Sequence, residues 1–253
     1  MLVDIVNEQC LHAGVTLYIV NDVINYDILR RLSENAGVKQ FNRRPGSRNP
    51  LPLLSLNAAL LKERGDIIHC HNYNMIDLLL PVFRKKTVLT IHNTISRPID
   101  FTRYHRCFAI SAAVQESLRV HAGAGSKVVQ NGVAFGAIKA KGAHSREQGV
   151  FRVLQTGRLD HHTKGQHTAI MALGVLKKRG ITNVQIDFIG EGNSASYLKQ
   201  LSREQEVAAQ IRFLGLRDRD YVYQQLHQYD LLIQPSLYEG FGLPVVEAFA
   251  SGT

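Results

Sequence analysis

Two glutamates near the end of the chain lie eight positions apart in a glycine-rich segment. The segment is PSLYEGFGLPVVEA, residues 235–248, and its carboxylates are Glu239 and Glu247. The run DLLIQP before it predicts a strand, and the apolar residues that follow predict a helix that begins near Leu243. Glu239 would lie in the loop and Glu247 one turn into the helix, so both could reach one pocket. A loop carboxylate can accept hydrogen bonds from sugar hydroxyls, and a helix carboxylate can accept two from a ribose diol.

Each glutamate also has a purely structural interpretation. Glu239 could accept backbone N–H groups in its own turn, and Glu247 could be an exposed residue of the helix. Glu247, however, stands between valines and alanines, where an unpaired charge would be costly. Beside Gly240 and Gly242, the free N–H groups at the start of the helix could also hold phosphate oxygens.

An arginine and a lysine follow another predicted strand, VFRVLQT. They belong to Gly157-Arg158-Leu159 and to Lys164-Gly165. Ligands of open α/β sheets bind outside the carboxyl ends of the strands, where glycines let the backbone approach closely. Arg158 and Lys164 could therefore clamp a diphosphate, the first by its planar fork and the second as a point charge. Taken alone, a plain surface pair explains them equally well.

The elements that must position these residues alternate between strand and helix. Apolar, β-branched runs predict strands at residues 15–21, 66–71, 87–92, 106–111 and 127–132 in the first half, and at 150–156, 183–189, 210–214 and 230–235 in the second. Helical spacing is predicted for residues 2–10, 25–37 and 50–65, and the last two segments each end in glycine, which is typical of a left-handed helix stop. Such alternation predicts parallel strands joined by helices, the doubly wound α/β class.

The segment between Gly132 and Gly149 is small, basic and polar, and it lacks a sustained apolar period. We interpret it as a linker between two similar α/β halves that face one another. The predicted domains are residues 1–144 and 145–253.

The combined motifs resemble those of the family 4 glycosyltransferases. Glu239 to Glu247 matches the E-x7-E motif of that family, GRLDHHTKG matches its phosphate-binding loop, and QNGV at 130–133 and IGEG at 189–192 are similar as well. The resemblance implies a GT-B fold of two facing Rossmann-like domains, the first on the acceptor side and the second binding the donor. It also implies that Arg158 and Lys164 bind the donor diphosphate, Glu239 the transferred sugar and Glu247 the ribose. The full donor site implied is Gly157, Arg158, Lys164, Glu239, Gly240, Phe241, Gly242, Leu243 and Glu247.

His92 ends the predicted strand TVLTIH. A single histidine at a strand end is often structural, yet α/β sheets bind ligands at these ends. The resemblance matches His92 to a histidine between the domains, near the transferred sugar and the leaving phosphate. His92, Glu239, Arg158 and Lys164 are therefore the predicted catalytic residues, with Asn93, Thr94 and His71 as weaker candidates.

The resemblance implies transfer of a sugar from a nucleoside diphosphate to a hydroxyl acceptor, with retention and without a metal or other cofactor. The acceptor would be a sugar or lipid-linked molecule of bacterial lipopolysaccharide, exopolysaccharide or glycolipid synthesis. The family's first strand with its glycine-rich loop, and its C-terminal part, have no match here, so we expect both domains to be incomplete. Two alternatives stay open: an inactive fragment that acts as a binding or scaffold module, and a sugar-nucleotide epimerase of the same fold.

Charge is uneven along the chain. Residues 1–144 hold 18 Lys and Arg against 10 Asp and Glu, a net of +8, whereas the remainder holds 12 against 11, a net of +1. The basic half suits an anionic membrane, although a solvated basic face would explain it as well. Nucleic acid is disfavoured because no exposed aromatics interleave with the cations.

The sequence shows neither a membrane-spanning apolar run nor a signal peptide at its start. We therefore expect a cytoplasmic protein that can attach peripherally to the inner face of the plasma membrane. The odd cysteines Cys10, Cys70 and Cys107 predict reduced, buried thiols. A metal at His69-Cys70-His71 is disfavoured because a strand directs alternate side chains to opposite faces.

Overall fold

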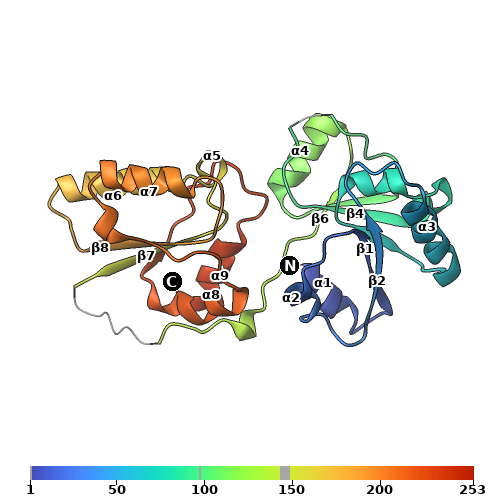
Figure 1. Cartoon of the computed structure of the whole chain (residues 1–253), viewed down its shortest axis with the longest axis horizontal. Coiled ribbons are helices and arrows are strands. Elements are labelled where there is room, and N and C mark those ends of the chain that lie inside the picture. The colour runs from blue at the N-terminus through green and yellow to red at the C-terminus, as the bar shows by residue number, and fades with distance from the viewer. Residues whose placement is uncertain (1, 97, 143–148) are drawn as a thin grey trace. The chain divides into compact units, whose positions relative to one another are not determined.

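The computed structural model describes residues 2–96, 98–142 and 149–253, and it divides into two compact units between Gly132 and Val133. Every strand pairing among the described residues is parallel, and helices or turns join successive strands (Figure 1). The predicted α/β class is confirmed.

The first unit contains two parallel sheets. Its strands are β1 Val15–Asn21 and β2 Ala36–Arg43, which pair with each other, and β3 Ile68–Cys70, β4 Thr87–Ile91, β5 Arg106–Ala109 and β6 Lys127–Val128, which pair in that order. Its helices are α1 Leu2–Gln9, α2 Tyr26–Leu29, α3 Leu51–Glu63 and α4 Ala112–Ala122, with 3₁₀ turns η1 Tyr73–Leu78 and η2 Pro81–Lys86.

The core of the first unit lies where α4 packs on the larger sheet. Leu89 of β4, Ala109 of β5 and Leu118 of α4 are buried there. The α4 helix begins where Ser111 Oγ accepts a hydrogen bond from Val114 N at 3.2 Å, and it ends at Gly123, whose φ is 58°. Both ends therefore follow ordinary capping chemistry.

The second unit has one four-stranded sheet. Its strands are β7 Phe151–Thr156, β8 Val184–Ile189, β9 Ile211–Phe213 and β10 Leu231–Leu232, in the order β10-β7-β8-β9. Its helices are α5 His161–Lys164, α6 Gln166–Lys178, α7 Ala195–Glu204, α8 Arg219–Gln225 and α9 Leu243–Ser251, with 3₁₀ turns η3 Phe135–Ala137, η4 Ala208–Gln210 and η5 Leu226–Gln228. The strand order reverses between β7 and β10, and such a switch point is where open α/β sheets bind ligands.

Helices cover both faces of this sheet (Figure 1). Val153 of β7 packs with Ile170 of α6 and Leu198 of α7 on one face. The next residue of the strand, Leu154, packs with Leu226 and the other residues of the second cluster on the opposite face. The alternation of strand side chains thus builds two cores around one sheet.

The predicted helix at residues 25–37 is wrong in extent. The helix α2 ends at Leu29, turns follow at residues 30–35, and the strand β2 then begins at Ala36 and runs parallel to β1. Phe41 of β2 is buried, and its ring stacks on Tyr18 of β1 at 5.5 Å between centroids. Burial of this aromatic pair favours a strand where the local spacing favours a helix.

The two predicted glycine stops are also wrong. Gly37 lies within β2, and α3 ends at Arg64, whose φ of 51° is left-handed, one residue before Gly65. Arg64 N donates to Leu60 O, so it closes the helix in the position that glycine usually takes.

The two units divide earlier than the predicted boundary at 144/145. Ile138 is buried in the second unit, beside Leu226. Lys139 N donates to Tyr223 O at 3.2 Å, and Lys141 N donates to Ser251 O at 2.7 Å. This part of the predicted linker therefore packs as a strap on the second unit, and residues 143–148 lie outside the described residues.

Candidate functional site

Two loops meet at the switch point of the second sheet. One follows β7 and contains Arg158 and Lys164, and the other follows β10 and contains Glu239. Leu237 N in the second loop donates to Thr163 O in the first at 3.0 Å. The GRLDHHTKG motif and the first glutamate of the E-x7-E motif, far apart in the chain, are therefore neighbours.

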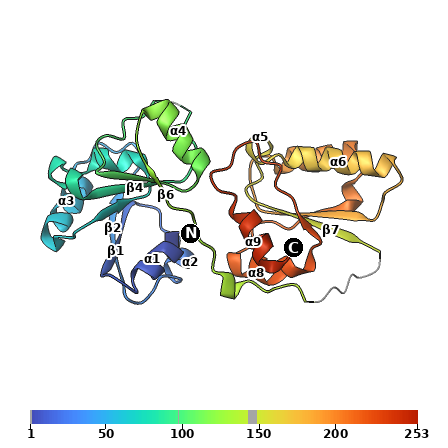
Figure 2. The same ribbon diagram turned by 180° about the vertical axis from the view of Figure 1, so that it is seen from behind.

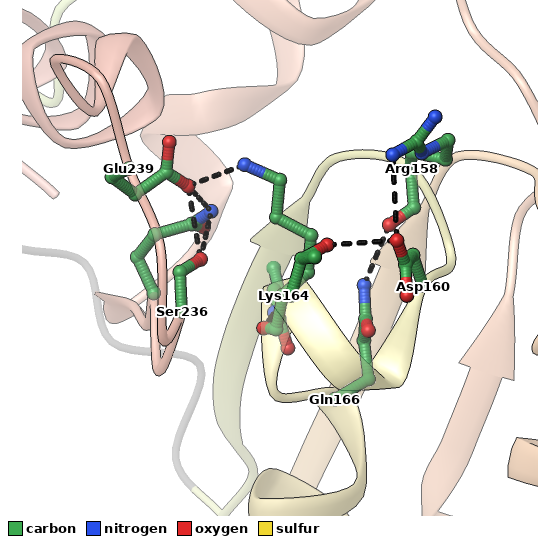
Figure 3. A network of polar contacts seen from close by, with 9 residues as sticks. Arg158, Asp160, Lys164, Gln166, Ser236 and Glu239 are labelled. Carbon is green, nitrogen blue, oxygen red and sulfur yellow. Dashed lines mark hydrogen bonds and ion pairs between the residues drawn. The ribbon is translucent and has the colours of Figure 1, made fainter. Parts of the chain in front are cut away.

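Lys164 and Glu239 form the centre of this contact (Figure 3). Lys164 Nζ lies 2.7 Å from Glu239 Oε1, and the same oxygen accepts hydrogen bonds from Gln234 Nε2 and Ser236 Oγ, each at 2.9 Å. Burial raises the pKa of Glu239, but these donors outweigh it and hold the pKa below its usual value. The carboxylate is therefore ionised at neutral pH and turned toward the β7 loop.

Glycines allow the loops to approach this closely. A Cβ on Gly165, whose φ is 66°, would lie 2.0 Å from Pro235 O. A Cβ on Gly190 would lie 2.0 Å from Gly157 O, so the IGEG segment packs closely against the β7 loop. Only a residue without a side chain fits at either position.

Two buried glutamines hold the carbonyl groups of the β7 loop. Gln155 Nε2 donates to Lys164 O at 2.8 Å, and Gln166 Nε2 donates to Arg158 O at 2.9 Å. With Gln234 and Ser236, they are site residues that sequence reasoning missed. Gln155 follows Val153 and Leu154 in the predicted strand VFRVLQT, and an amide side chain next to such apolar residues is the signal that could have indicated it.

Arg158 points to a different carboxylate. Its side chain is 70% exposed and lies 3.3 Å from Asp160 Oδ2. Thr163 Oγ1 donates to that oxygen at 2.9 Å, and this bond is the main cause that lowers the pKa of Asp160. Arg158 and Lys164 are thus each paired with a separate acid (Figure 3).

The helix α9 begins at Leu243, as predicted. Gly242 before it has a left-handed φ of 77°, and Val245 N donates to Gly242 O at 2.9 Å. Glu247 is half-buried, and its Oε1 accepts a hydrogen bond from Tyr223 OH at 3.2 Å. Gly240, Phe241, Gly242 and Leu243, which complete the predicted donor set, are half-buried in the loop and first turn.

His92 lies in the first unit, directly after β4, within a group of three histidines. His92 Nε2 is 3.1 Å from His71 Nδ1, and the rings of His71 and His69 lie 4.3 Å apart. Burial lowers the pKa of all three imidazoles. Within the described residues, His92 Nδ1 is buried without a hydrogen-bond partner.

The alternation predicted for His69-Cys70-His71 is visible here, because the two histidine rings share one side. Cys70 and Cys107 are buried free thiols, whereas Cys10 is half-buried. Burial raises the pKa of Cys70 to about 12 and that of Cys107 to about 11. The described part of the chain holds no group of three side chains suited to a metal ion.

Two family models match the chain, one on each unit. Residues 16–135 match the model described as Glycosyltransferase Family 4, and residues 138–253 match Glycosyl transferases group 1.

The chain aligns with part of the length of each curated relative. The chain is 37% identical over 105 residues to glycogen synthase of Mycobacterium tuberculosis, covering 42% of this chain and 25% of that protein. It is 28% identical over 213 residues to the putative glycosyltransferase EpsF of Bacillus subtilis, covering 79% of this chain and 52% of that protein. The chain therefore spans between a quarter and about half of the length of these relatives.

Solved structures superpose on nearly the whole of this chain. HepE of Anabaena, in complex with UDP and glucose, superposes with a TM-score of 0.76 at 19% identity, over 100% of this chain and 74% of that one. WaaG, a glycosyltransferase involved in lipopolysaccharide biosynthesis, superposes with a TM-score of 0.71 at 13% identity, over 98% of this chain and 74% of that one. At these identities the likeness concerns the fold, and it confirms the predicted GT-B class.

Proposed function

Since this chain belongs to the group 1 glycosyltransferases with a GT-B fold, we propose that it transfers a sugar from a nucleoside-diphosphate sugar to a hydroxyl acceptor. The observation that carries the proposal is the junction of Lys164 and Glu239 at the switch point between β7 and β10. A cation and a carboxylate side by side suit a ligand that offers phosphate oxygens beside sugar hydroxyls.

In the proposed complex, Lys164 turns from Glu239 to the donor phosphates, and Arg158 leaves Asp160 to join it. The N–H groups at the start of α9 add to this charge stabilisation. Glu239 then accepts hydrogen bonds from the transferred sugar. Glu247, whose carboxylate is oriented by the hydrogen bond from Tyr223 OH, accepts hydrogen bonds from the ribose.

The reaction breaks the bond between the anomeric carbon and the diphosphate oxygen, and it forms a bond from that carbon to the acceptor oxygen. The acceptor proton passes to the departing phosphate on the same face of the sugar, which gives retention. Cationic side chains stabilise the negative charge of the leaving group. His92 contributes a polar contact to the sugar, and no metal or other cofactor enters the proposal.

We propose a lipid-linked or saccharide acceptor of bacterial envelope or polysaccharide synthesis. The basic first unit supports this proposal, as does the involvement of WaaG, which has a similar fold, in lipopolysaccharide biosynthesis. A cytoplasmic protein, peripheral on the inner face of the membrane, would meet both the donor and such an acceptor. Among the described residues, the helices are too short or too polar to span a bilayer.

The test is the melting temperature of the purified chain with UDP, GDP, ADP and their sugars. A ligand at 100 times its Kd stabilises the native state by about 2.7 kcal/mol. We expect one nucleotide to raise the melting temperature, UDP being tried first because HepE was solved with it. Arg158→Ala and Glu247→Ala should abolish the shift, whereas Arg179→Ala, at an exposed position of the same unit, should retain it.

Product analysis separates the remaining possibilities. Transfer gives free nucleoside diphosphate and a glycosylated acceptor, whereas an epimerase changes the sugar without an acceptor. A folded chain that binds none of these nucleotides would contradict the proposal and favour a binding or scaffold role.

A further inference from the structure

The helix α3 of the first unit is apolar on both sides. Leu56 is buried and faces the core, as in any surface helix. On the outer side, however, Leu51, Leu54 and Leu61 are 66%, 62% and 51% exposed. Their spacing of three and seven residues puts them on one face. The solvent-facing side of a surface helix in a globular protein is ordinarily polar, so this stripe of exposed leucines indicates a binding surface.

Neighbouring residues extend the stripe beyond the helix. Asn57 lies between Leu54 and Leu61 along α3, and its side chain donates to Leu78 O and accepts from Leu80 N, both at 2.9 Å. These bonds hold the exposed Leu80 beside the stripe. Val82, two residues further on, is 66% exposed.

Basic residues lie at the C-terminal end of the stripe. Lys86 Nζ donates to Gly65 O at 3.0 Å, which brings the end of η2 to the end of α3. This contact gathers five exposed cations, Lys62, Arg64, Arg84, Lys85 and Lys86. The nearby acids are Glu63, which is ion-paired with Lys39 and hydrogen-bonded by Tyr18, the exposed Asp66, and the exposed Asp100, whose carboxylate interacts with Arg84.

We propose that this lipid-docking face, formed by Leu51, Leu54, Leu61, Leu80 and Val82 with the five cations beside them, binds the surface of an anionic lipid bilayer. Aliphatic side chains can enter the boundary between headgroups and acyl chains, while lysine and arginine reach the lipid phosphates. Figures 1 and 2 show α3 at the periphery of the first unit, as such docking requires.

The charge pattern favours lipid over a second copy of this chain. Two copies that met through this face would bring ten basic side chains together, and like charges at an interface are costly. An anionic bilayer instead offers charges opposite in sign to all five cations. The inference deepens the acceptor part of the proposed function, on which it rests, since a protein held here would meet a lipid-linked acceptor.

The test is flotation of the purified chain with phosphatidylcholine vesicles, with and without phosphatidylglycerol, over a series of salt concentrations. We expect binding to the anionic vesicles, weakened by salt. Leu54→Ser/Leu61→Ser and Arg84→Glu/Lys85→Glu should each reduce the partition coefficient by about tenfold or more. The matched controls Leu216→Ser and Lys178→Glu alter exposed residues of the second unit and should bind like the wild type.

Failure to bind anionic vesicles would overturn the inference, as would equal binding by the leucine double variant. Elution as a dimer that the same variant converts to a monomer, with no vesicle binding, would assign the face to a second copy. Nucleotide-dependent melting is measured on every variant. A variant that loses flotation but keeps its nucleotide-dependent rise in melting temperature therefore tests the lipid-docking face alone. A chain whose melting temperature does not rise with nucleotide argues against the donor site instead.

Discussion

Lys164 Nζ and Glu239 Oε1 lie 2.7 Å apart, although 75 positions separate the two residues in the chain. The lysine that we propose for the donor phosphates is therefore ion-paired with the carboxylate that we propose for the sugar. A donor must displace this contact, and in doing so it would free both groups for their separate roles. The ion pair joins the β7 loop to the β10 loop.

Substitution at either end of this pair should have different effects on the proposed donor site. Lys164→Met removes a charge-assisted hydrogen bond to phosphate, worth about 1.5–3 kcal/mol, so the Kd for the nucleoside diphosphate should rise roughly tenfold to hundredfold. Glu239→Gln should not raise that Kd, because it removes no phosphate contact and weakens the ion pair that the donor displaces, but it should lower turnover roughly tenfold to hundredfold. Titration calorimetry with the nucleotide and an assay of product formation measure the two effects.

Equal weakening of nucleotide binding by both variants would contradict this division of roles. Gln234→Leu is a useful comparison, since it removes a neutral donor from Glu239 Oε1 and leaves the ion pair in place. It should change nucleotide affinity less than Lys164→Met does.

Gly165→Ala should destabilise the second unit more than Gly180→Ala. Both glycines have a positive φ, 66° and 79°. An alanine at either position therefore loses about 1–2 kcal/mol of stability because its backbone must stay left-handed. The Cβ at position 165 would also meet Pro235 O at 2.0 Å, whereas position 180 has open space. We expect Gly165→Ala to have the lower melting temperature and the weaker nucleotide binding. Equal melting temperatures would show that the β10 loop moves away without cost.

The strands and helices of the second unit were predictable because their signals are local. Apolar runs of strand length precede each loop, and the helix after Gly242 begins at the predicted Leu243. The β2 strand was missed for the opposite reason. Its burial depends on the pairing of Phe41 with Tyr18, which no local period in residues 25–37 reveals.

The site was predictable in residue type but not in pairing. The motifs selected Lys164 and Glu239, yet nothing in the sequence indicates that each would be the other's partner. Arg158 was expected beside Lys164 on one diphosphate, and the structure pairs its side chain with Asp160. His161 of the same loop is half-buried, and Ser194 Oγ lies 2.7 Å from its Nδ1. Such contacts depend on tertiary approach, which spacing along the chain does not encode.

Acidification should destabilise the first unit through its histidine group. Burial first, and then the neighbouring His69 and His92, lower the pKa of His71 from 6.5 to about 4. The folded state thus favours the neutral ring, so the stabilisation is fully present above pH 6.5 and is lost as the pH falls toward 4. His71→Asn should show a shallower loss of melting temperature over this interval. Histidine NMR signals provide a direct check, and a His71 resonance that titrates near 6.5 would contradict the prediction.

A polar cluster joins β8 and β9, and it consists of Asp187 of β8, Arg212 of β9 and Tyr229. Arg212 Nε and Nη2 donate to the two oxygens of Asp187 at 2.7 and 2.5 Å, and Tyr229 OH donates to Oδ2 at 2.7 Å. The Asp187 side chain is only 3% exposed, whereas that of Arg212 is 54% exposed. The desolvation cost therefore falls mainly on the carboxylate, and removal of the cation should be the more damaging change.

Arg212→Met should accordingly lower the free energy of unfolding of the second unit by about 3 kcal/mol, because it leaves a buried carboxylate with a single neutral donor. Adding Asp187→Leu should recover part of this loss, since an apolar pair of similar volume needs no charge compensation. Tyr229→Phe alone should cost about 1 kcal/mol. Urea titrations of the single and double variants measure the coupling. The free-energy costs of Arg212→Met and Asp187→Leu could instead add in the double variant. Additivity would mean that water solvates the Asp187 carboxylate in Arg212→Met, and that the cluster contributes little beyond its individual hydrogen bonds.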